Sequence, residues 1–363
     1  MTTPLQREIA DIIAAEGPIS LERFMALAAM HPKFGYYRTA RPIGRGGDFI
    51  TAPEIHQMFG ELIGLWAAEV WRLMGEPQPL RLVELGPGRG TLMSDLLRAA
   101  RIVPPFLAAL DVHLVEISEA LIAEQRARLQ TCGRPLTWHT AIAELPAGPS
   151  IIVANEFFDA LPVRHYVRTA QGWNERLVGL ADDGRLTFGL AAEPDATIAV
   201  NAPQGTLLEI GAAAQQAMRD LAAHIAQEGG ALLAIDYGYR VKRSGETLQA
   251  VKDHAYVDPL RTPGEADLTA HVDFAALARA AVAAGARTHG PVAQGTWLAR
   301  LGIFQRAAAL KHAASPAQAE AIDAALARLA QPGPAAGAGA SMAELFQVLC
   351  ITSPGLEPPG FST

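Results

Sequence analysis

The sequence predicts an α/β fold in which helices cover both faces of a parallel sheet. From Leu80 onward, short apolar runs alternate with segments of helical periodicity, the pattern of strands joined by crossover helices. The first run, "LRLVEL", enters a glycine-rich turn, "GPGRG", that opens one of these helices. Half of the 363 residues are hydrophobic, which is enough for a large core. Since single cores stop growing at roughly 250–300 residues, we expect one main domain with an additional lobe.

Residues 1–78 are expected to form an N-terminal lobe of helices and a long loop. In "LQREIADIIAA" the apolar residues recur at helical spacing, and "LERFMALAAM" indicates a second helix behind the capping residue Ser20. "HPKFGYYRTARPIGRGGDFITAPEI" is rich in Gly, Pro and aromatic residues and has no period, so we predict an ordered loop. "HQMFGELIGLWAAEVWRLMG" then returns to helical spacing.

Residues 79–363 are expected to form the main domain. Five strands are predicted, at "RLVEL", "DVHLVEI", "LTWHT", "SIIVANE" and "ALLAIDYGY". Helices are predicted between them, at "TLMSDLLRAA", "SEALIAEQRARLQ" and "LLEIGAAAQQAMRDLAAHIAQEG". After the fourth strand, at about residues 163–200, polar and apolar residues alternate around "QG" and "DDG", which indicates an inserted antiparallel β-meander.

The last third of the chain contains a second insertion and the closing elements of this domain. An irregular segment at about 240–270 precedes helices at "FAALARAAVAAG", "QRAAALKHAA" and "PAQAEAIDAALARLA". "QPGPAAGAGA" has the composition of a flexible linker, and "MAELFQVLCI" indicates a strand that returns to the sheet. The last residues, "SPGLEPPGFST", are expected to fray.

Composition disfavours several classes of protein. The net charge of -7 argues against nucleic acid as a partner, and no apolar stretch is long enough for insertion into a membrane. The two cysteines, Cys132 and Cys350, have no metal-ligand spacing, so we expect neither a disulfide nor a metal site. A reducing compartment and an N-terminus without a secretory signal together predict a cytoplasmic location.

The glycine-rich turn is the first candidate site. Gly86, Gly88 and Gly90 follow a strand and open a helix, with Pro87 between them and Thr91 directly after. Glycine permits positive φ and close approach of a ligand, and the amides at the start of the helix point toward that ligand. The alternative is a tight strand-to-helix turn that binds nothing.

Two acidic residues define the ligand that this turn would hold. Glu84 precedes the first glycine, where a carboxylate suits a cationic amino group and would repel a pyrophosphate. Glu116 ends the next strand, where a carboxylate can accept hydrogen bonds from ribose hydroxyls. S-adenosylmethionine fits this description, because it has a ribose, a cationic amino-acid end and no pyrophosphate. NAD fits less well, which leaves an NAD-dependent oxidoreductase as a less favoured interpretation.

Several motifs together resemble a known family. "VELGPGRGTL" followed by "LVEIS" resembles the first motifs of class I S-adenosylmethionine-dependent methyltransferases. With "HPKFGYY", "GDFITAPEIHQMFGELIG", "NEFFDALPV", "IDYGY" and "GEADLTAHVDF" in this order, the chain resembles the MidA-like family from about His31 to "MAELFQVL". That family includes the mitochondrial arginine methyltransferase that assists complex I assembly. The resemblance implies a Rossmann-like sheet of seven strands and methyl transfer to an arginine of a protein, with the quinone-side subunit of a respiratory NADH dehydrogenase as the natural substrate.

The resemblance also implies which residues bind the cofactor. The three glycines would line its methionine part, and Glu116, with Ile117 beside it, would hold the ribose. No acidic residue directly follows "LTWHT" to bind the adenine amino group. The backbone of Ala141 and Ile142 is one candidate for that contact, and Glu144 is another.

The fourth strand ends in "ANEFFDALP", where we expect the chemistry. Ligands of open α/β sheets bind outside the carboxyl ends of the strands, so Asn155 and Glu156 would emerge beside the cofactor, with Asp159 one turn further on. Carboxylates can grip a guanidinium through paired hydrogen bonds and align it for transfer, and they also suit a lysine. Glu156 is the first candidate for this role and Asp159 the second. Either carboxylate can instead cap a helix.

The loop segment "GGDFITAPE" is expected to fold over the cofactor and shape the substrate channel. Its candidate residue is Asp48, and Thr51 is alternatively a cap for a helix that begins at Pro53. Asp236 and His271 are further polar residues, and His271 has the features of a structural residue. The leading hypothesis is a protein methyltransferase; the alternative is a non-catalytic assembly factor that holds the cofactor and grips a partner.

Overall fold

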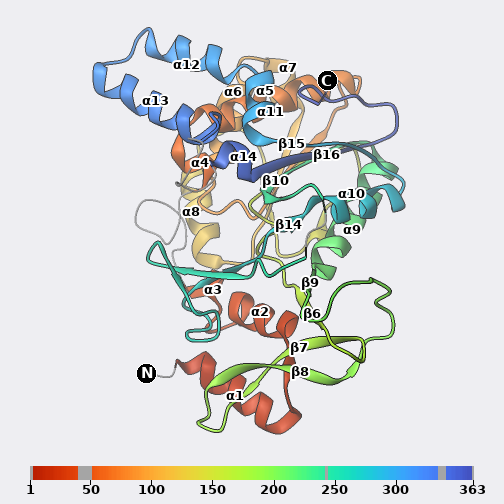
Figure 1. The fold of residues 1–363 in the computed structure, drawn as a ribbon. Coiled ribbons are helices and arrows are strands. Elements are labelled where there is room, and N and C mark those ends of the chain that lie inside the picture. Colours follow the sequence, from red (N-terminus) through yellow and green to blue (C-terminus); the bar gives the residue numbers. More distant parts are fainter. Residues whose placement is uncertain (1–2, 40–50, 242–243, 334–340, 362–363) are drawn as a thin grey trace. The chain divides into compact units, whose positions relative to one another are not determined.

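The computed structural model describes residues 3–39, 51–241, 244–333 and 341–361, and these fold into two compact units (Figure 1). Unit 1 comprises residues 1–49, 158–216 and 242–272, and unit 2 comprises residues 50–157, 217–241 and 273–363. Each unit is assembled from three separate stretches of chain. The division at residue 78 stays a prediction.

Unit 2 is built around a sheet with the strand order β15-β16-β10-β5-β2-β3-β4, to which the short β14 adds at β10. Neighbouring strands from β4 to β10 run parallel, and β16 runs antiparallel to both β10 and β15. The bounds are β2 (Leu80–Leu85), β3 (Leu110–Val115), β4 (Leu136–His139), β5 (Ser150–Asn155), β10 (Gly230–Tyr239), β14 (Val272–Asp273), β15 (Arg287–Ala293) and β16 (Phe346–Thr352). The predicted α/β class and the seven-stranded path are therefore confirmed.

The five predicted strands and the returning strand β16 are all present, whereas β15 was missed. Its sequence, "RTHGPVA", lacks an apolar run, and its pairing with β16 is irregular between His289 and Val292. A strand that pairs along only part of its length and contains Gly290 and Pro291 has no local pattern to reveal it.

The helices of unit 2 cover the sheet on both faces. They are α4 (Ala52–Ile55), α5 (Met58–Leu73), α6 (Thr91–Ala100), α7 (Pro104–Ala109), α8 (Glu119–Leu129), α10 (Phe274–Ala283), α11 (Gln294–Arg300), α12 (Ile303–Lys311), α13 (Pro316–Leu329) and α14 (Met342–Leu345), with a 3-10 turn η1 (Ile142–Glu144). α9 (Ala212–Glu228) runs from unit 1 into unit 2.

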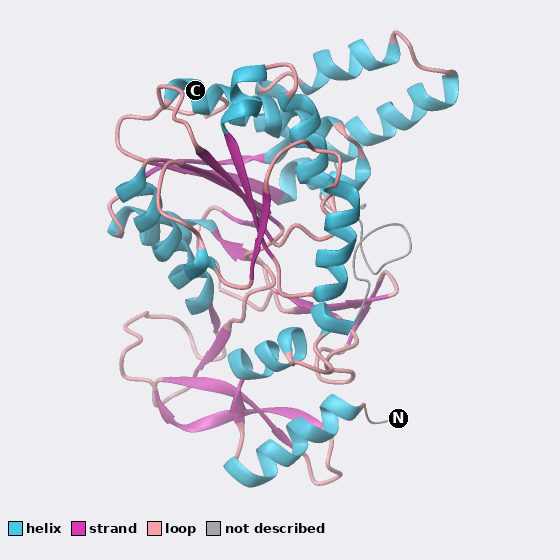
Figure 2. Cartoon of the chain, turned by 180° about the vertical axis from the view of Figure 1, so that it is seen from behind, coloured by secondary structure: helices cyan, strands magenta, loops and turns pink. Residues whose placement is uncertain are grey.

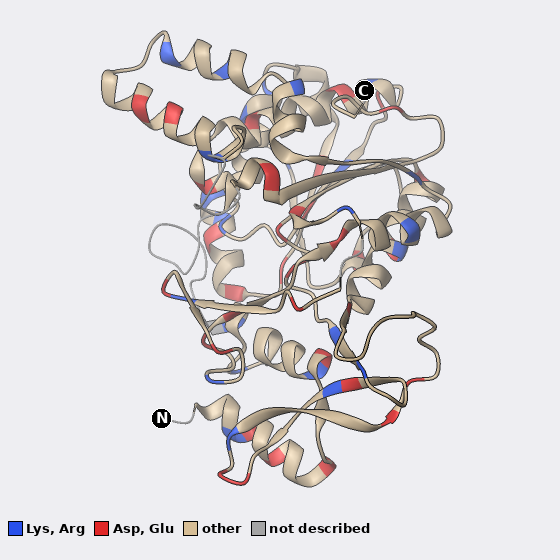
Figure 3. Ribbon diagram, viewed as in Figure 1, with Lys and Arg blue, Asp and Glu red and all other residues tan. Residues whose placement is uncertain are grey.

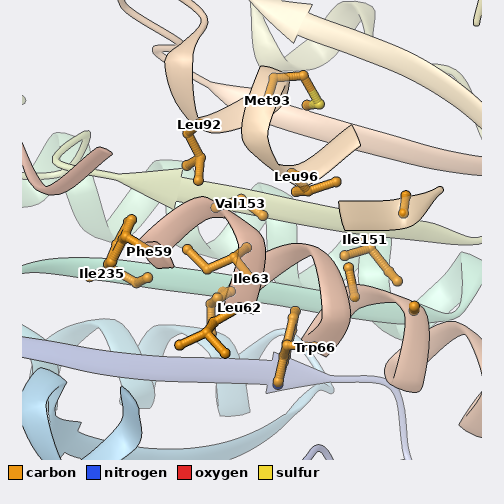
Figure 4. Packing of buried hydrophobic residues seen from close by; sticks show 14 of the residues in the cluster. Phe59, Leu62, Ile63, Trp66, Leu92, Met93, Leu96, Ile151, Val153 and Ile235 are labelled. Atoms are coloured by element: carbon orange, nitrogen blue, oxygen red, sulfur yellow. The ribbon is translucent and has the colours of Figure 1, made fainter. Parts of the chain in front are cut away.

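Side-chain alternation along the strands decides which helices meet which face. Phe59 and Ile63 of α5 and Leu96 of α6 pack toward Val153 of β5 and Ile235 of β10 (Figure 4). Because successive strand residues point to opposite faces, the intervening residues of β10 point to the other face. α10 contacts β10, β15 and β16. The parallel strands are therefore apolar on both sides, as their unbroken hydrophobic runs require.

The C-terminal segment after β16 is ordered, which makes the expected fraying wrong. Leu356 is buried in the main core, and the carbonyl of Pro359 accepts a hydrogen bond from Trp66 Nε1 at 3.2 Å. The carbonyl of Gly360 accepts one from Arg300 Nη1 at 3.1 Å. Proline and glycine composition alone did not reveal that two tryptophans, Trp66 and Trp297, lie beneath this segment.

Truncating Leu356 is expected to test this packing. Leu356→Ala should lower the free energy of unfolding by about 2–3 kcal/mol, because it removes buried methyl groups and leaves a cavity. The neighbouring Glu357→Ala should change it by less than about 0.5 kcal/mol, because the Glu357 side chain and its ion pair with Arg287 are exposed. Urea denaturation measures both free energies of unfolding. If the two variants are equally stable, the burial of Leu356 does not stabilise the protein.

Unit 1 contains helices and two antiparallel sheets (Figure 2). Its helices are α1 (Pro4–Glu16), α2 (Leu21–Met30) and α3 (Tyr36–Thr39). One sheet has the order β1-β7-β6-β9, with β8 paired to β7, and the other has the order β12-β11-β13. The bounds are β1 (Ile19–Ser20), β6 (Arg164–Arg168), β7 (Trp173–Leu180), β8 (Leu186–Pro194), β9 (Leu207–Ile210), β11 (Gln249–Lys252), β12 (Ala255–Val257) and β13 (Asp267–Thr269).

Local signals explain most of unit 1. Thr3 and Ser20 cap α1 and α2 through side-chain oxygens that accept from Gln6 N at 3.0 Å and Arg23 N at 3.1 Å. The predicted meander is confirmed as β6, β7 and β8. The expectation that "LLEI" continues into a helix is wrong, because these residues form β9 against β6 and the helix begins only after Gly211. A four-residue apolar run does not distinguish strand from helix.

Candidate active site at the carboxyl ends of the strands

Three polar residues end adjacent strands on one face of the unit 2 sheet. Glu84 follows Leu80 and Leu82 of β2, whose side chains lie in the core beneath α5 and α6. Glu84 stands in register with Leu114 of β3 and with Val153 of β5, so Glu116 and Asn155 each come two residues later on the same face. The carboxyl ends of β3, β2 and β5 thus place these side chains side by side in the sheet order.

Backbone hydrogen bonds extend this register into the loops that follow the strands. Gly86 N donates to Val115 O at 3.0 Å, and Glu116 N donates to His139 O at 2.9 Å. Glu156 N donates to Ile235 O at 2.9 Å. The backbone pairing of the sheet therefore continues to the first residue beyond each of these strands.

The glycine turn requires glycine for its backbone conformation. Gly86, Gly88 and Gly90 have φ values of 61°, 54° and 74°, which side chains rarely adopt. A Cβ at Gly86 or Gly90 would stand 3.4 Å from its nearest neighbour, an ordinary contact. The structure therefore brings the three glycines together as predicted, and Thr91 begins α6 directly after them.

Glu84 is a buried carboxyl whose second oxygen has no hydrogen-bond partner among the described residues. It is 3% exposed, and the backbone N–H of Met93, in the first turn of α6, hydrogen-bonds to it. The pKa of Glu84 is raised to about 8, chiefly by burial; the Met93 hydrogen bond opposes this rise, and the charge of Glu116 adds to it. A cationic amino group is the ligand that such a carboxyl lacks, so the site fits the amino-acid end of S-adenosylmethionine.

Both oxygens of the Glu116 carboxylate accept hydrogen bonds from described residues. Its Oε1 accepts from Ile117 N and Ser118 N, both at 2.9 Å, and its Oε2 accepts from Gln125 Nε2 at 3.2 Å. Donors of this kind favour the ionised carboxylate, the form that accepts hydrogen bonds from ribose hydroxyls. Gln125 was missed by the sequence analysis, because nothing distinguishes one glutamine among the polar residues of α8.

Two candidates for the adenine contact, Ile142 and Glu144, lie in or beside the turn η1 that follows β4. Ile142 is half-buried at the start of η1. The carboxylate of Glu144 accepts from Thr140 N at 2.8 Å and from Thr140 Oγ1 at 3.0 Å. These hydrogen bonds, the backbone one first, lower the pKa of Glu144. Glu144 therefore stabilises its own turn, and an adenine contact by Ile142 stays a prediction.

Glu156 combines backbone strain with a specific hydrogen bond. Its φ of 51° lies in the left-handed region, which costs of order 1–3 kcal/mol for a residue other than glycine. Its Oε1 accepts from Ala52 N at 3.2 Å and from Asn155 Nδ2 at 3.1 Å. Strain of this kind persists where the surroundings impose it, and it is concentrated at functional sites.

The segment "TAPE", residues 51–54, contacts both Glu156 after β5 and the glycine turn before α6. Thr51 precedes α4 but makes no capping hydrogen bond with its side chain, so the expectation that Thr51 caps this helix is wrong. Glu156 supplies the oxygen in its place. In the same helix, Glu54 hydrogen-bonds to the Thr91 hydroxyl and forms an ion pair with Arg89 at 3.5 Å. Asp48, the other candidate of this loop, lies outside the described residues.

The remaining candidates are described within their own units. Asp159 belongs to unit 1 and is buried, and its carbonyl accepts from Ala270 N at 3.0 Å. Asp236, in unit 2, is fully buried, and its Oδ1 accepts from Tyr237 N at 2.9 Å. His271 N donates to Thr247 Oγ1 at 2.8 Å in unit 1. Among the described residues, no group of three or more metal-ligating side chains is arranged to hold a metal ion.

Charge is distributed without a single dominant sign. Acidic and basic side chains are interspersed along the ribbons of both units (Figure 3). In the part of the chain that the structure describes, no helix is both long and apolar enough to cross a membrane.

The seven-stranded sheet, the glycine turn and the two acidic residues define a class I S-adenosylmethionine-dependent methyltransferase, and comparison with known proteins identifies the family. Residues 62–292 match the family model described as "Putative S-adenosyl-L-methionine-dependent methyltransferase", and the chain belongs to this family. S-adenosylmethionine is its cofactor.

Individual relatives match over most of their length. The chain is 38% identical to a Danio rerio protein over 83% of this chain and 77% of that protein. It is 36% identical to a Homo sapiens protein over 84% of this chain and 74% of that protein. Both are named "Protein arginine methyltransferase NDUFAF7, mitochondrial". A Burkholderia thailandensis protein crystallised with S-adenosyl-homocysteine is 30% identical, with a TM-score of 0.81 over 99% of this chain and 92% of that chain.

These relatives correct one expectation. They are named as mitochondrial proteins, so the predicted cytoplasmic location is wrong. A low number of cysteines indicates a reducing environment without distinguishing one reducing compartment from another.

Proposed function

We propose that this methyltransferase modifies an arginine side chain of a protein, and that Glu156 binds the guanidinium. The observation that carries the proposal is the left-handed backbone of Glu156 directly after β5, three residues beyond Val153, which stands in register with Glu84. The arginine specificity is supported by the names of the relatives.

The chemistry assigned to the residues follows from charge and geometry. S-adenosylmethionine supplies an electrophilic methyl group on a sulfonium. The carboxylate of Glu156 accepts hydrogen bonds from two guanidinium N–H groups and so orients the remaining nitrogen toward that methyl. It also attracts positive charge onto the nitrogens that it binds, which leaves the attacking nitrogen more nucleophilic. Fixing this alignment can lower the activation free energy of methyl transfer by about several kcal/mol.

Asp159 and Asp48 are proposed to contribute further negative charge for the same substrate. Asp159 follows Glu156 by three residues in "NEFFDALP", and Asp48 precedes α4 in the loop that resembles the family's "GDFITAPE" motif. Asn155, whose Nδ2 donates to Glu156 Oε1, is proposed to hold that carboxylate beside the cofactor.

The proposed natural substrate is the quinone-side subunit of a respiratory NADH dehydrogenase, whose assembly the methylation would assist. This proposal is supported by the resemblance of five ordered motifs to a family that includes such an assembly enzyme. The mitochondrial relatives are compatible with a respiratory substrate.

Methyl-labelled S-adenosylmethionine tests the proposal. The purified protein is incubated with label and a lysate of cells that lack it, and labelled protein bands are hydrolysed to identify the modified residue. We expect a discrete band that yields methylarginine, and no band with Glu156→Gln. Methyl-lysine would contradict the arginine assignment. Absence of transfer by protein that binds the cofactor would favour a non-catalytic assembly role.

A further inference from the structure

Gln125 joins three segments of the cofactor site from inside α8. Its side chain is completely buried. Its Nε2 donates to the carbonyl of Gly88 at 2.7 Å and to Glu116 Oε2 at 3.2 Å, and its Oε1 accepts from Trp138 Nε1 at 2.8 Å. One amide thus touches the glycine turn, the acidic residue after β3 and the strand β4.

The chemistry of these partners determines the orientation of the amide. An indole N–H can only donate and a backbone carbonyl can only accept, so the Gln125 oxygen must face Trp138 and its NH2 group must face Gly88. The second N–H then points to Glu116, and the amide has no alternative arrangement that satisfies all three partners. Arg126, whose guanidinium lies 4.2 Å from the centre of the Trp138 ring, packs over the indole.

The same contact orients the carboxylate of Glu116. Two backbone amides, from Ile117 and Ser118, bind Oε1 alone. A carboxylate held at one oxygen can still rotate about the bond to that oxygen, whereas a donor at Oε2 fixes its plane. Gln125 Nε2 is a donor at Oε2.

We propose that Gln125 is a positioning residue for ribose recognition, which holds the plane of the Glu116 carboxylate against the ribose hydroxyls and ties it to the glycine turn. The inference rests on the proposed contact between Glu116 and the ribose. It deepens that role by assigning the geometry of the contact to a residue that does not itself touch the ribose.

The test compares S-adenosyl-homocysteine with its 2′,3′-dideoxy analogue, which lacks the ribose hydroxyls. Isothermal titration calorimetry of wild-type protein should show a preference for the natural ligand of about 10²-fold, since the analogue cannot donate the hydroxyl hydrogen bonds to the Glu116 carboxylate. Gln125→Glu has the same shape but at neutral pH cannot donate, and it places a second negative charge at Glu116. We expect it to bind S-adenosyl-homocysteine about 10–100-fold more weakly and to reduce the preference to about threefold or less.

Trp138→Phe provides a second variant that keeps an aromatic ring in place. It removes the N–H that Gln125 Oε1 accepts from, so the buried amide loses one of its three anchors and is held less firmly toward Glu116. We expect a loss of about 3–10-fold in affinity for S-adenosyl-homocysteine and again a reduced preference over the analogue. Thermal unfolding of each variant establishes that it is folded.

Three outcomes distinguish the inference from the role on which it rests. Glu116→Ala should abolish the preference for the ribose hydroxyls; if it does not, the proposed Glu116 contact fails, and the inference fails with it. If Glu116→Ala abolishes the preference while Gln125→Glu and Trp138→Phe retain it, only the inference is overturned. Loss of the preference in all three variants supports both.

Discussion

Glu156→Gln should reduce methyl transfer by about 10²-fold or more while changing the dissociation constant of S-adenosyl-homocysteine by less than about threefold. The amide keeps the size of the side chain, and its oxygen can still accept from Ala52 N and Asn155 Nδ2. What it loses is the negative charge that we propose binds the guanidinium and stabilises positive charge as the methyl is transferred. Steady-state kinetics with labelled cofactor and calorimetry with S-adenosyl-homocysteine measure the two quantities.

The backbone strain at Glu156 allows a second variant to separate function from stability. Glu156→Gly accommodates the φ of 51° without strain but loses the carboxylate that binds Ala52 N. We expect it to be as inactive as Glu156→Gln, with a free energy of unfolding within about 1 kcal/mol of wild type because the two effects oppose each other. The surface variant Glu69→Gln, which disrupts only an exposed pair with Arg72, should leave both quantities unchanged. Near wild-type activity of Glu156→Gln would exclude Glu156 from the proposed role.

Glu84→Gln should weaken S-adenosyl-homocysteine binding by about 10²-fold and abolish a proton release that accompanies binding to the wild-type protein. With its pKa raised to about 8 by burial, Glu84 holds a proton at pH 7 in the free protein. Pairing with the ligand's ammonium group favours the ionised form, so the proton leaves when the ligand binds. Calorimetry in two buffers of different ionisation enthalpy measures the number of protons released.

The same carboxyl gives the stability of the free protein a defined dependence on pH. In the unfolded chain Glu84 titrates near its usual pKa of about 4.3, whereas in the folded chain it retains its proton up to about pH 8. Between these values the folded state binds more protons, so the free energy of unfolding decreases as pH rises and levels off above pH 8. The full effect is up to about 5 kcal/mol, and Glu84→Gln should remove it.

A matched control separates Glu84 from general acidity. Glu119→Gln, a substitution at an exposed residue of α8, should change neither the ligand affinity nor the proton release. If Glu84→Gln binds the ligand as tightly as wild type and the wild-type protein releases no proton, Glu84 serves only to receive the Met93 amide at the start of α6. Urea denaturation of the free proteins from pH 5 to pH 9 gives the stability profiles.

The sequence by itself determined the α/β class, five strands of the sheet and the position of the glycine turn. These follow from local rules: the apolar runs of buried strands, the helical periodicity between them and the need for glycine where φ is positive. The same alternation placed Glu84 and Glu116 at strand ends, because strand direction and sheet order were implied by the βα repeats. Local patterns carry this information since each depends on residues within a few positions of one another.

Only the tertiary structure decided which distant residues hydrogen-bond to the candidate site residues. The hydrogen bond between Ala52 N and Glu156 joins residues 104 positions apart, and the bond between Gln125 and Gly88 joins residues 37 positions apart. The strand β15 is likewise defined by its pairing with β16. The C-terminal segment is held in place by its contacts with the tryptophans beneath it. Contacts of this kind depend on how helices and strands pack, and no period in a single sequence records which distant side chain supplies the partner.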